Sequence, residues 1–68
     1  MKYFIKIEDS RLVSGSNTKW IHKDEQGREF LGPPINVAYG KTIIVEASNF
    51  PFEDGYYHIY KVIGEVEG

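Results

Sequence analysis

Short runs of β-forming residues, separated by turn residues, recur along the whole chain and leave little room for a helix. Residues 2–8 alternate, with Tyr3, Ile5 and Ile7 on one side of the chain and mostly charged residues on the other. Alternation with a period of two is the pattern of a strand that buries one face. Residues 41–47 hold a dense run of β-branched side chains, which pack well on a pleated sheet. These two segments predict the central strands of the fold.

Three further segments complete the predicted sheet. Residues 18–23 and 28–31 are rich in β-formers and are separated by Asp-Glu-Gln-Gly, a four-residue link typical of a hairpin in which Asp24 begins the turn. Residues 56–63 resume the β-like pattern after a turn-rich connection. The expected strands are therefore 2–8, 18–23, 28–31, 41–47 and 56–63.

The last segment also has a helical interpretation. Tyr56, Ile59, Tyr60 and Ile63 have the spacing i, i+3, i+4 and i+7, which is that of an amphipathic helix. Tyrosine and β-branched residues dominate the segment, however, and these favour a strand. The following Gly64 would weaken a helix, whereas a glycine within a strand often marks a bulge. A strand is the favoured prediction.

Two segments are predicted to lie outside the sheet. Residues 9–17 are mainly Ser, Gly, Asn, Asp and Arg, so we expect a loop that holds at most a short extended piece. Residues 32–36 begin with Gly-Pro-Pro, and proline lacks the amide hydrogen that a sheet requires. This second segment should cross between elements.

The chain has 68 residues and no cysteine, so a single compact domain over residues 1–68 must be stabilised without disulfides. Short strands in so small a chain are best stabilised by curling into a barrel. The predicted fold is all-β, a small five-stranded antiparallel barrel, SH3-like as the first choice and OB-like or a β-sandwich as the second. The predicted core comprises Ile5, Ile7, Ile43, Val45 and Ile59, with at least one of Tyr57 and Ile63.

Charge and composition indicate which partners the protein can bind and in which compartment it resides. The formal net charge is −2, and the charges are spread along the chain, which weakens a nucleic-acid interpretation. Charged residues interrupt the first apolar run, so it does not resemble a signal peptide. No apolar run approaches the roughly 20 residues of a membrane span. The absence of cysteine suits a reducing compartment, so we expect a cytoplasmic protein that does not bind a membrane.

No residue pattern predicts catalysis. His22, Asp24 and His58 imitate a metal site of two histidines and one carboxylate, but such sites require a larger interior. Asp24 is better explained by the turn, and the histidines by partly exposed positions on strands. We expect no enzyme activity, no catalytic residues, no metal site and no cofactor.

The aromatic residues are the feature that points to binding. Residues 56–63 are apolar on both faces, and a small barrel can bury only one of them. Exposed aromatic rings are typical of interface anchors. The predicted partner-binding residues are Phe4, Trp20, Tyr56, His58 and Tyr60. The alternative is that the Phe50-Pro51-Phe52 segment folds over the second face.

The sequence therefore predicts a small non-catalytic interaction protein that binds a protein partner, or its own copy, through an aromatic face and a strand edge. The alternative function is single-stranded nucleic-acid binding, with bases stacked on rings and lysines near the phosphates. A chain this compact also suits an accessory protein of a phage or mobile element. The identity of the partner, the oligomeric state, the strand order and the biological process do not follow from the residues.

Overall fold

The computed structural model describes residues 1–35 and 40–66, and its regular structure consists of five β-strands. Within these residues there is no helix that is long and apolar enough to cross a membrane. The all-β prediction is confirmed. The strands are β1 (Lys2–Leu12), β2 (Trp20–Asp24), β3 (Glu29–Gly32), β4 (Thr42–Ala47) and β5 (Tyr57–Glu65).

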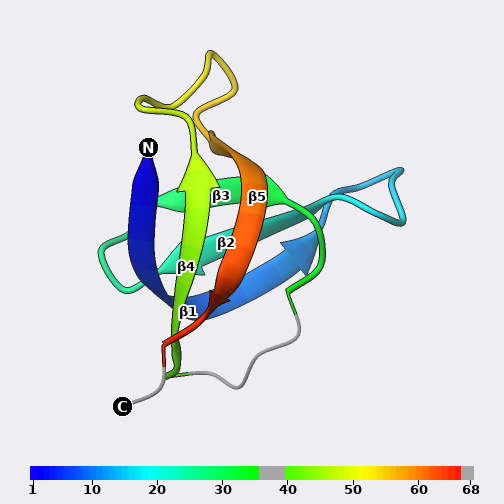
Figure 1. Cartoon of the computed structure of the whole chain (residues 1–68). Coiled ribbons are helices and arrows are strands. Elements are labelled where there is room, and N and C mark those ends of the chain that lie inside the picture. The colour runs from blue at the N-terminus through cyan, green and yellow to red at the C-terminus, as the bar shows by residue number, and fades with distance from the viewer. Residues whose placement is uncertain (36–39, 67–68) are drawn as a thin grey trace.

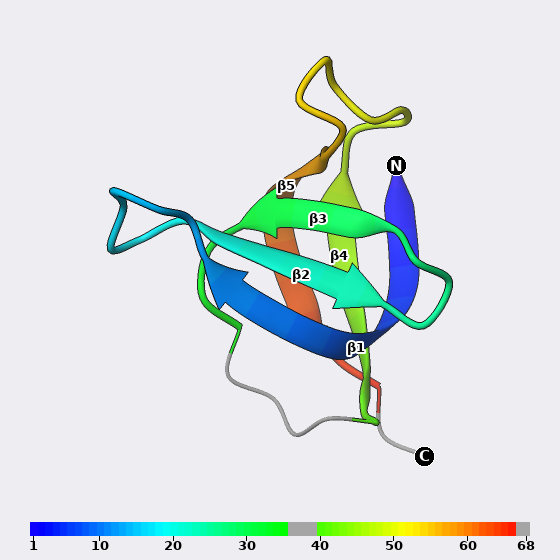
Figure 2. The same ribbon diagram turned by 180° about the vertical axis from the view of Figure 1, so that it is seen from behind.

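The five strands close into a barrel in the order β1-β2-β3-β5-β4 (Figures 1 and 2). Closure depends on β1, which is long enough to belong to both sides of the barrel. Its first half pairs with β4 from Lys2 to Lys6, and its second half pairs with β2 from Ile7 to Leu12. A β-bulge between Ile7 and Asp9 separates the two halves. Bulges bend a strand and increase its twist, which lets β1 turn from one sheet into the other.

One strand pair differs from the expected antiparallel arrangement. β3 and β5 run parallel, with Phe30 opposite Tyr57 and Leu31 opposite His58, whereas the other four pairings are antiparallel. Parallel neighbours require a crossover connection rather than a hairpin. Here the connection from β3 to β5 contains β4, which lies between β1 and β5. After β4 the chain reverses direction and runs as β5 beside β3. The prediction of a wholly antiparallel barrel is therefore wrong for this one contact.

The boundaries of two predicted segments also change. β1 continues to Leu12, so residues 9–12 are strand rather than loop, because the bulge restores their register with β2. Gly32 ends β3, and residues 33–35 then leave the sheet as the prolines predict. The remainder of the predicted crossing, Asn36, lies outside the described residues.

β5 is a strand, so the helical alternative is wrong. The strand runs from Tyr57 through Gly64 to Glu65, and its register with β4 shifts at two places. One shift falls beside Gly64, between the Ile44–Gly64 pair and the Val45–Val62 pair. The glycine thus accompanies a bulge, as its position in a strand pattern predicts.

The core forms where the inward faces of the strands meet. Ile5, Ile7, Ile43 and Val45 are buried as predicted. Ile59 and Tyr57 are half-buried and pack against them, whereas Ile63 is exposed. The buried cluster also contains Phe30 and Ala47, which the prediction omitted. Phe30 stacks on Tyr57, with ring centroids 5.1 Å apart.

The environment of His22 corrects the sequence prediction of a partly exposed histidine. Its side chain is 1% exposed. Nε2 lies 2.8 Å from the Pro33 carbonyl oxygen, and Nδ1 lies 2.7 Å from the Ser10 hydroxyl. A neutral ring with its hydrogen on Nε2 satisfies both contacts, donating to Pro33 and accepting from Ser10. Burial lowers the pKa of His22, and the Pro33 contact opposes that shift in part.

Asp24 begins the β2–β3 turn as predicted. One carboxylate oxygen accepts from the backbone amides of Gln26 and Arg28, and the other accepts from the Arg28 guanidinium at 2.8 Å. The carboxylate is 2% exposed, and these contacts account for both of its oxygens. The polar side-chain atoms of Asp24 and His22 are thus all engaged in hydrogen bonds or ion pairs within the barrel.

Candidate binding surface

The β4–β5 loop, residues 48–56, projects from one end of the barrel (Figure 1). It carries two phenylalanines in solvent: Phe50 is 76% exposed and Phe52 is 48% exposed. The loop also carries Glu53 and Asp54 and contains no Lys or Arg. It therefore presents aromatic rings beside negative charge.

Ser48 fixes the base of this loop. Its hydroxyl accepts from the His58 backbone amide at 3.1 Å and donates to the Phe50 carbonyl oxygen at 2.8 Å. Its own amide donates to the His58 carbonyl oxygen at 3.0 Å. Ser48 is buried, so these contacts are shielded from water. The backbone at Phe50 is thereby tied to the first residues of β5.

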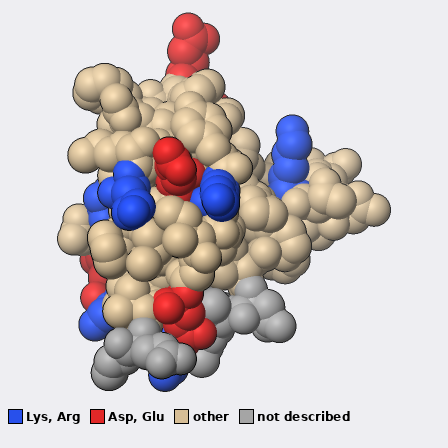
Figure 3. Space-filling view, in the orientation of Figure 1, with Lys and Arg blue, Asp and Glu red and all other residues tan. Residues whose placement is uncertain are grey.

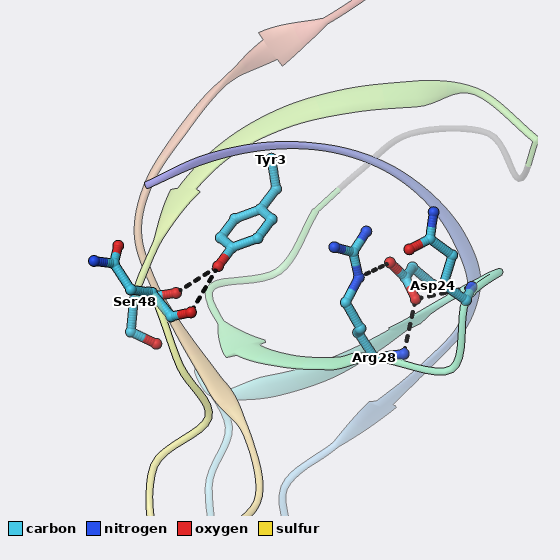
Figure 4. A network of polar contacts seen from close by, with 6 residues as sticks. Tyr3, Asp24, Arg28 and Ser48 are labelled. Atoms are coloured by element: carbon cyan, nitrogen blue, oxygen red, sulfur yellow. Dashed lines mark hydrogen bonds and ion pairs between the residues drawn. The ribbon is translucent and has the colours of Figure 1, made fainter.

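Tyr3 reaches the same point from β1 (Figure 4). Its hydroxyl donates to the Ser48 carbonyl oxygen at 2.9 Å and lies 3.3 Å from that of Asn49. Its ring packs edge-on against Phe30 and Tyr57, and partial burial raises the pKa of its phenol. The loop is thus connected to the aromatic part of the core.

The far side of the loop is held by Asp54. One carboxylate oxygen accepts from the Tyr56 amide at 2.9 Å, and the other lies 2.8 Å from His58 Nε2. The Tyr56 amide, and then His58, hold the pKa of Asp54 below its usual range. The His58 ring in turn stacks on Phe52, with centroids 3.9 Å apart and planes 12° apart. Phe52 is therefore oriented, although half of it remains in solvent.

The loop turns back on itself through two backbone hydrogen bonds. The Phe52 amide donates to Tyr56 and the Gly55 amide donates to Phe52. Gly55 has a φ of 86°, a left-handed conformation that glycine adopts without strain. Together with the Ser48 and Asp54 contacts, these bonds give the loop one defined shape.

A hollow of about 340 Å³ lies between the end of the β1–β2 loop, the end of β3 and the start of β5. It is bordered by Lys19, Leu31 and Pro33 on one side and by His58 and Ile59 on the other. Its open, shallow form and mixed lining differ from the enclosed pockets that hold small organic ligands.

Two of the five predicted partner-binding residues belong to this region. His58 supports Phe52, and the Tyr56 hydroxyl lies 3.4 Å from the Arg11 guanidinium, which is also paired with Glu29 at 2.9 Å. Both rings are half-buried. Their side chains thus support the loop and the adjoining face of β2 and β3.

The other three residues lie elsewhere. Phe4, on β1, is 60% exposed, and Tyr60, on β5, is 66% exposed. Trp20 is half-buried at the start of β2, opposite Gly32, whose α-carbon faces Ile59 of the core. The five residues therefore do not form one continuous patch, and their role in binding stays a prediction.

Sequence reasoning did not assign binding to Phe50 and Phe52. It offered them as a cover for the second face of residues 56–63, but their exposure, and that of Tyr60, shows that the loop projects instead. The available signal was the Pro51 between two phenylalanines in a turn-rich, acidic segment, which fits a protruding loop as well as a cover.

Comparison of the chain with protein-family models, with curated proteins and with solved structures found no match.

Proposed function

We propose that the chain is a non-catalytic cytoplasmic protein-binding module whose β4–β5 loop inserts Phe50 and Phe52 into an apolar pocket of a protein partner. The observation that carries the proposal is the exposure of Phe50, 76%, in a loop whose backbone is fixed by Ser48. Aromatic side chains, phenylalanine included, are enriched in protein interfaces relative to the rest of the surface. A loop that is already ordered loses less conformational entropy on binding, which favours affinity.

The charge of the loop supports a protein partner over a nucleic acid. Glu53 and Asp54 adjoin the two phenylalanines, and negative charge beside a stacking ring repels phosphates. A protein that presents Lys or Arg around an apolar pocket complements both features. The closed barrel also gives each strand a neighbour on both sides, so the proposal relies on side chains rather than on a free strand edge.

Single-stranded nucleic-acid binding is kept as a second candidate because of the barrel itself. A five-stranded Greek-key barrel in which β1 is shared by both sides supports the OB-like alternative over the SH3-like one. OB-folds bind oligonucleotides on the face of strands two and three, between the β1–β2 and β4–β5 loops. The hollow lined by Lys19 at the end of the β1–β2 loop and by Leu31 on β3 supports this candidate.

Site-specific photo-cross-linking tests the protein-binding proposal. A photoreactive phenylalanine analogue at position 50, in protein expressed in its native host, should form a covalent adduct with a protein. The same analogue at Ser14, which is exposed in the β1–β2 loop, serves as the matched control and should form none. Absence of a protein adduct from position 50, or equal adducts from both positions, would contradict the proposal.

A further inference from the structure

A second aromatic surface lies on the outer side of β1, β4 and β5, well away from the loop tip. At its centre, three residues lie in a row across the three strands. Phe4 pairs with Ile44, and Ile44 pairs with Gly64. Ile44 points outward because Ile43 and Val45, on either side, are buried. We call this surface the Phe4 face.

Gly64 leaves a gap in that row. A β-carbon built on Gly64 would have no atom within 4 Å, so a side chain at this position would enter open space. Ile44 borders the gap, and Phe4 lies beyond Ile44 in the same row. The arrangement provides a shelf with an apolar side on which an aromatic ring from another molecule can lie.

Lysines surround this shelf. Lys2 and Lys6 flank Phe4 along β1, and Lys61 follows on β5 across Glu46. Figure 3 shows basic side chains on both sides of an acidic one on this face. The ion pairs found within the described part of the chain involve Arg11, Arg28 and His58. The three lysines thus form no ion pair there, although Glu46 lies opposite both Lys2 and Lys61 in the sheet.

The Phe4 face carries three lysines around one glutamate, whereas the β4–β5 loop is acidic, and both surfaces carry aromatic rings. The loop offers Phe50 and Phe52 beside Glu53, and the face offers an apolar shelf among lysines. The loop projects from the end of the barrel, whereas the face lies on its side, so the loop of one molecule cannot cover its own face (Figure 1).

We propose that the partner of the loop is a second copy of this chain, with Phe50 of one copy lying on the Phe4 and Gly64 shelf of the next. This inference rests on the proposed function of the loop and names its partner. The contact joins two different surfaces, so it is heterologous, and each copy retains one free loop and one free face. Further copies extend the assembly into a ring or a filament.

Complementation between two variants tests the head-to-tail contact. Phe50→Ser removes the loop anchor, and Gly64→Glu fills the shelf and repels the acidic loop. Phe50 is exposed, and a side chain at position 64 would enter open space, so both variants should fold. Sedimentation velocity should show concentration-dependent assembly of the parent protein and a monomer for each variant alone. A mixture of the two variants should form a one-to-one dimer and nothing larger. The control Ser14→Glu, which adds an acidic side chain in the exposed β1–β2 loop, should assemble like the parent.

The outcomes separate this inference from the proposed function. A parent protein that remains monomeric at every concentration, or a variant mixture that forms no dimer, overturns the head-to-tail contact. Should position 50 then cross-link to a different protein, the loop is still a protein-binding element and only its partner was wrong. If position 50 gives no protein adduct and the parent is monomeric, both proposals fail.

Discussion

The α-carbon of Gly32 faces the side chain of Ile59 at the junction of β3 and β5. A β-carbon on Gly32 would lie 2.8 Å from Ile59 Cβ and 2.9 Å from Ile59 Cδ1. These separations are shorter than any real contact of a β-carbon. The parallel pairing that closes the barrel therefore depends on the absence of a side chain at position 32.

Replacing Gly32 by alanine should destabilise the protein. The added methyl group must displace Ile59 or push β3 away from β5, and such overpacking typically costs about 1–3 kcal/mol. Urea denaturation measures the loss. Gly64→Ala is the matched control, because that position has open space around it and should change the free energy of unfolding little. Equal stability of the Gly32→Ala variant and the parent would show that the strands can separate without penalty.

The strands could be predicted from the sequence because their signal is local. Alternation in residues 2–8 and the β-branched run in 41–47 identify their strands directly. The parallel contact between β3 and β5 has no such signal, since it arises from which strands meet when the barrel closes. The extension of β1 to Leu12 likewise depends on a bulge that only its pairing with β2 reveals.

The candidate site was predicted less completely for the same reason. The sequence predicts a partly exposed His22, because its burial depends on Ser10 and Pro33. These two residues are far from His22 in the sequence and contact it only when β1, β2 and β3 pair. Phe50 lies in a loop whose shape depends on hydrogen bonds from Ser48 to the Phe50 carbonyl oxygen and to the His58 amide on β5. Composition indicates that the chain has more aromatic rings than its core can hold, but it does not indicate which rings remain in solvent.

Removal of the Asp24 carboxylate should destabilise the β2–β3 turn. In the Asp24→Ala variant the Gln26 and Arg28 amides and the Arg28 guanidinium lose their acceptor. Removing the partner of buried polar groups costs about 1–3 kcal/mol. Asp24→Asn retains an acceptor oxygen and should lose less, and Glu25→Ala, at an exposed neighbour, should lose almost nothing. Thermal unfolding of the three variants gives the order, and a neutral Asp24→Ala variant would contradict this role.

Stability should fall on acidification because of His22. Its pKa in the folded protein is lowered below the ordinary value of 6.5 by burial. As the pH falls through 6.5, the unfolded chain binds a proton that the folded chain does not, which favours unfolding. The contribution of His22 to stability is thus present above pH 6.5 and is lost progressively toward the folded pKa. Urea denaturation over this range should show a smaller pH dependence for His22→Gln. His58 is present in both proteins, so a pH dependence that His22→Gln leaves unchanged would contradict the assignment.

The protein should bind single-stranded DNA or RNA only weakly at physiological salt. Nucleic-acid affinity comes mainly from Lys and Arg that neutralise phosphates, and the net charge here is −2. The hollow offers Lys19 at the end of the β1–β2 loop, but the β4–β5 loop, the second loop of an OB-fold site, carries Glu53 and Asp54. Fluorescence anisotropy with labelled oligonucleotides at several salt concentrations measures this.

If binding is found, the same measurement on charge variants shows which surface binds the nucleic acid. Lys19→Glu affects the hollow, whereas Lys2→Glu with Lys6→Glu affects the Phe4 face, so the two alter different surfaces. Strong, salt-sensitive binding that Lys19→Glu abolishes would favour an oligonucleotide site between the two loops, as in OB-folds. Binding lost only with Lys2→Glu and Lys6→Glu would instead assign the Phe4 face to a nucleic acid. That result would compete with the head-to-tail contact, because phosphates and the acidic loop would require the same lysines.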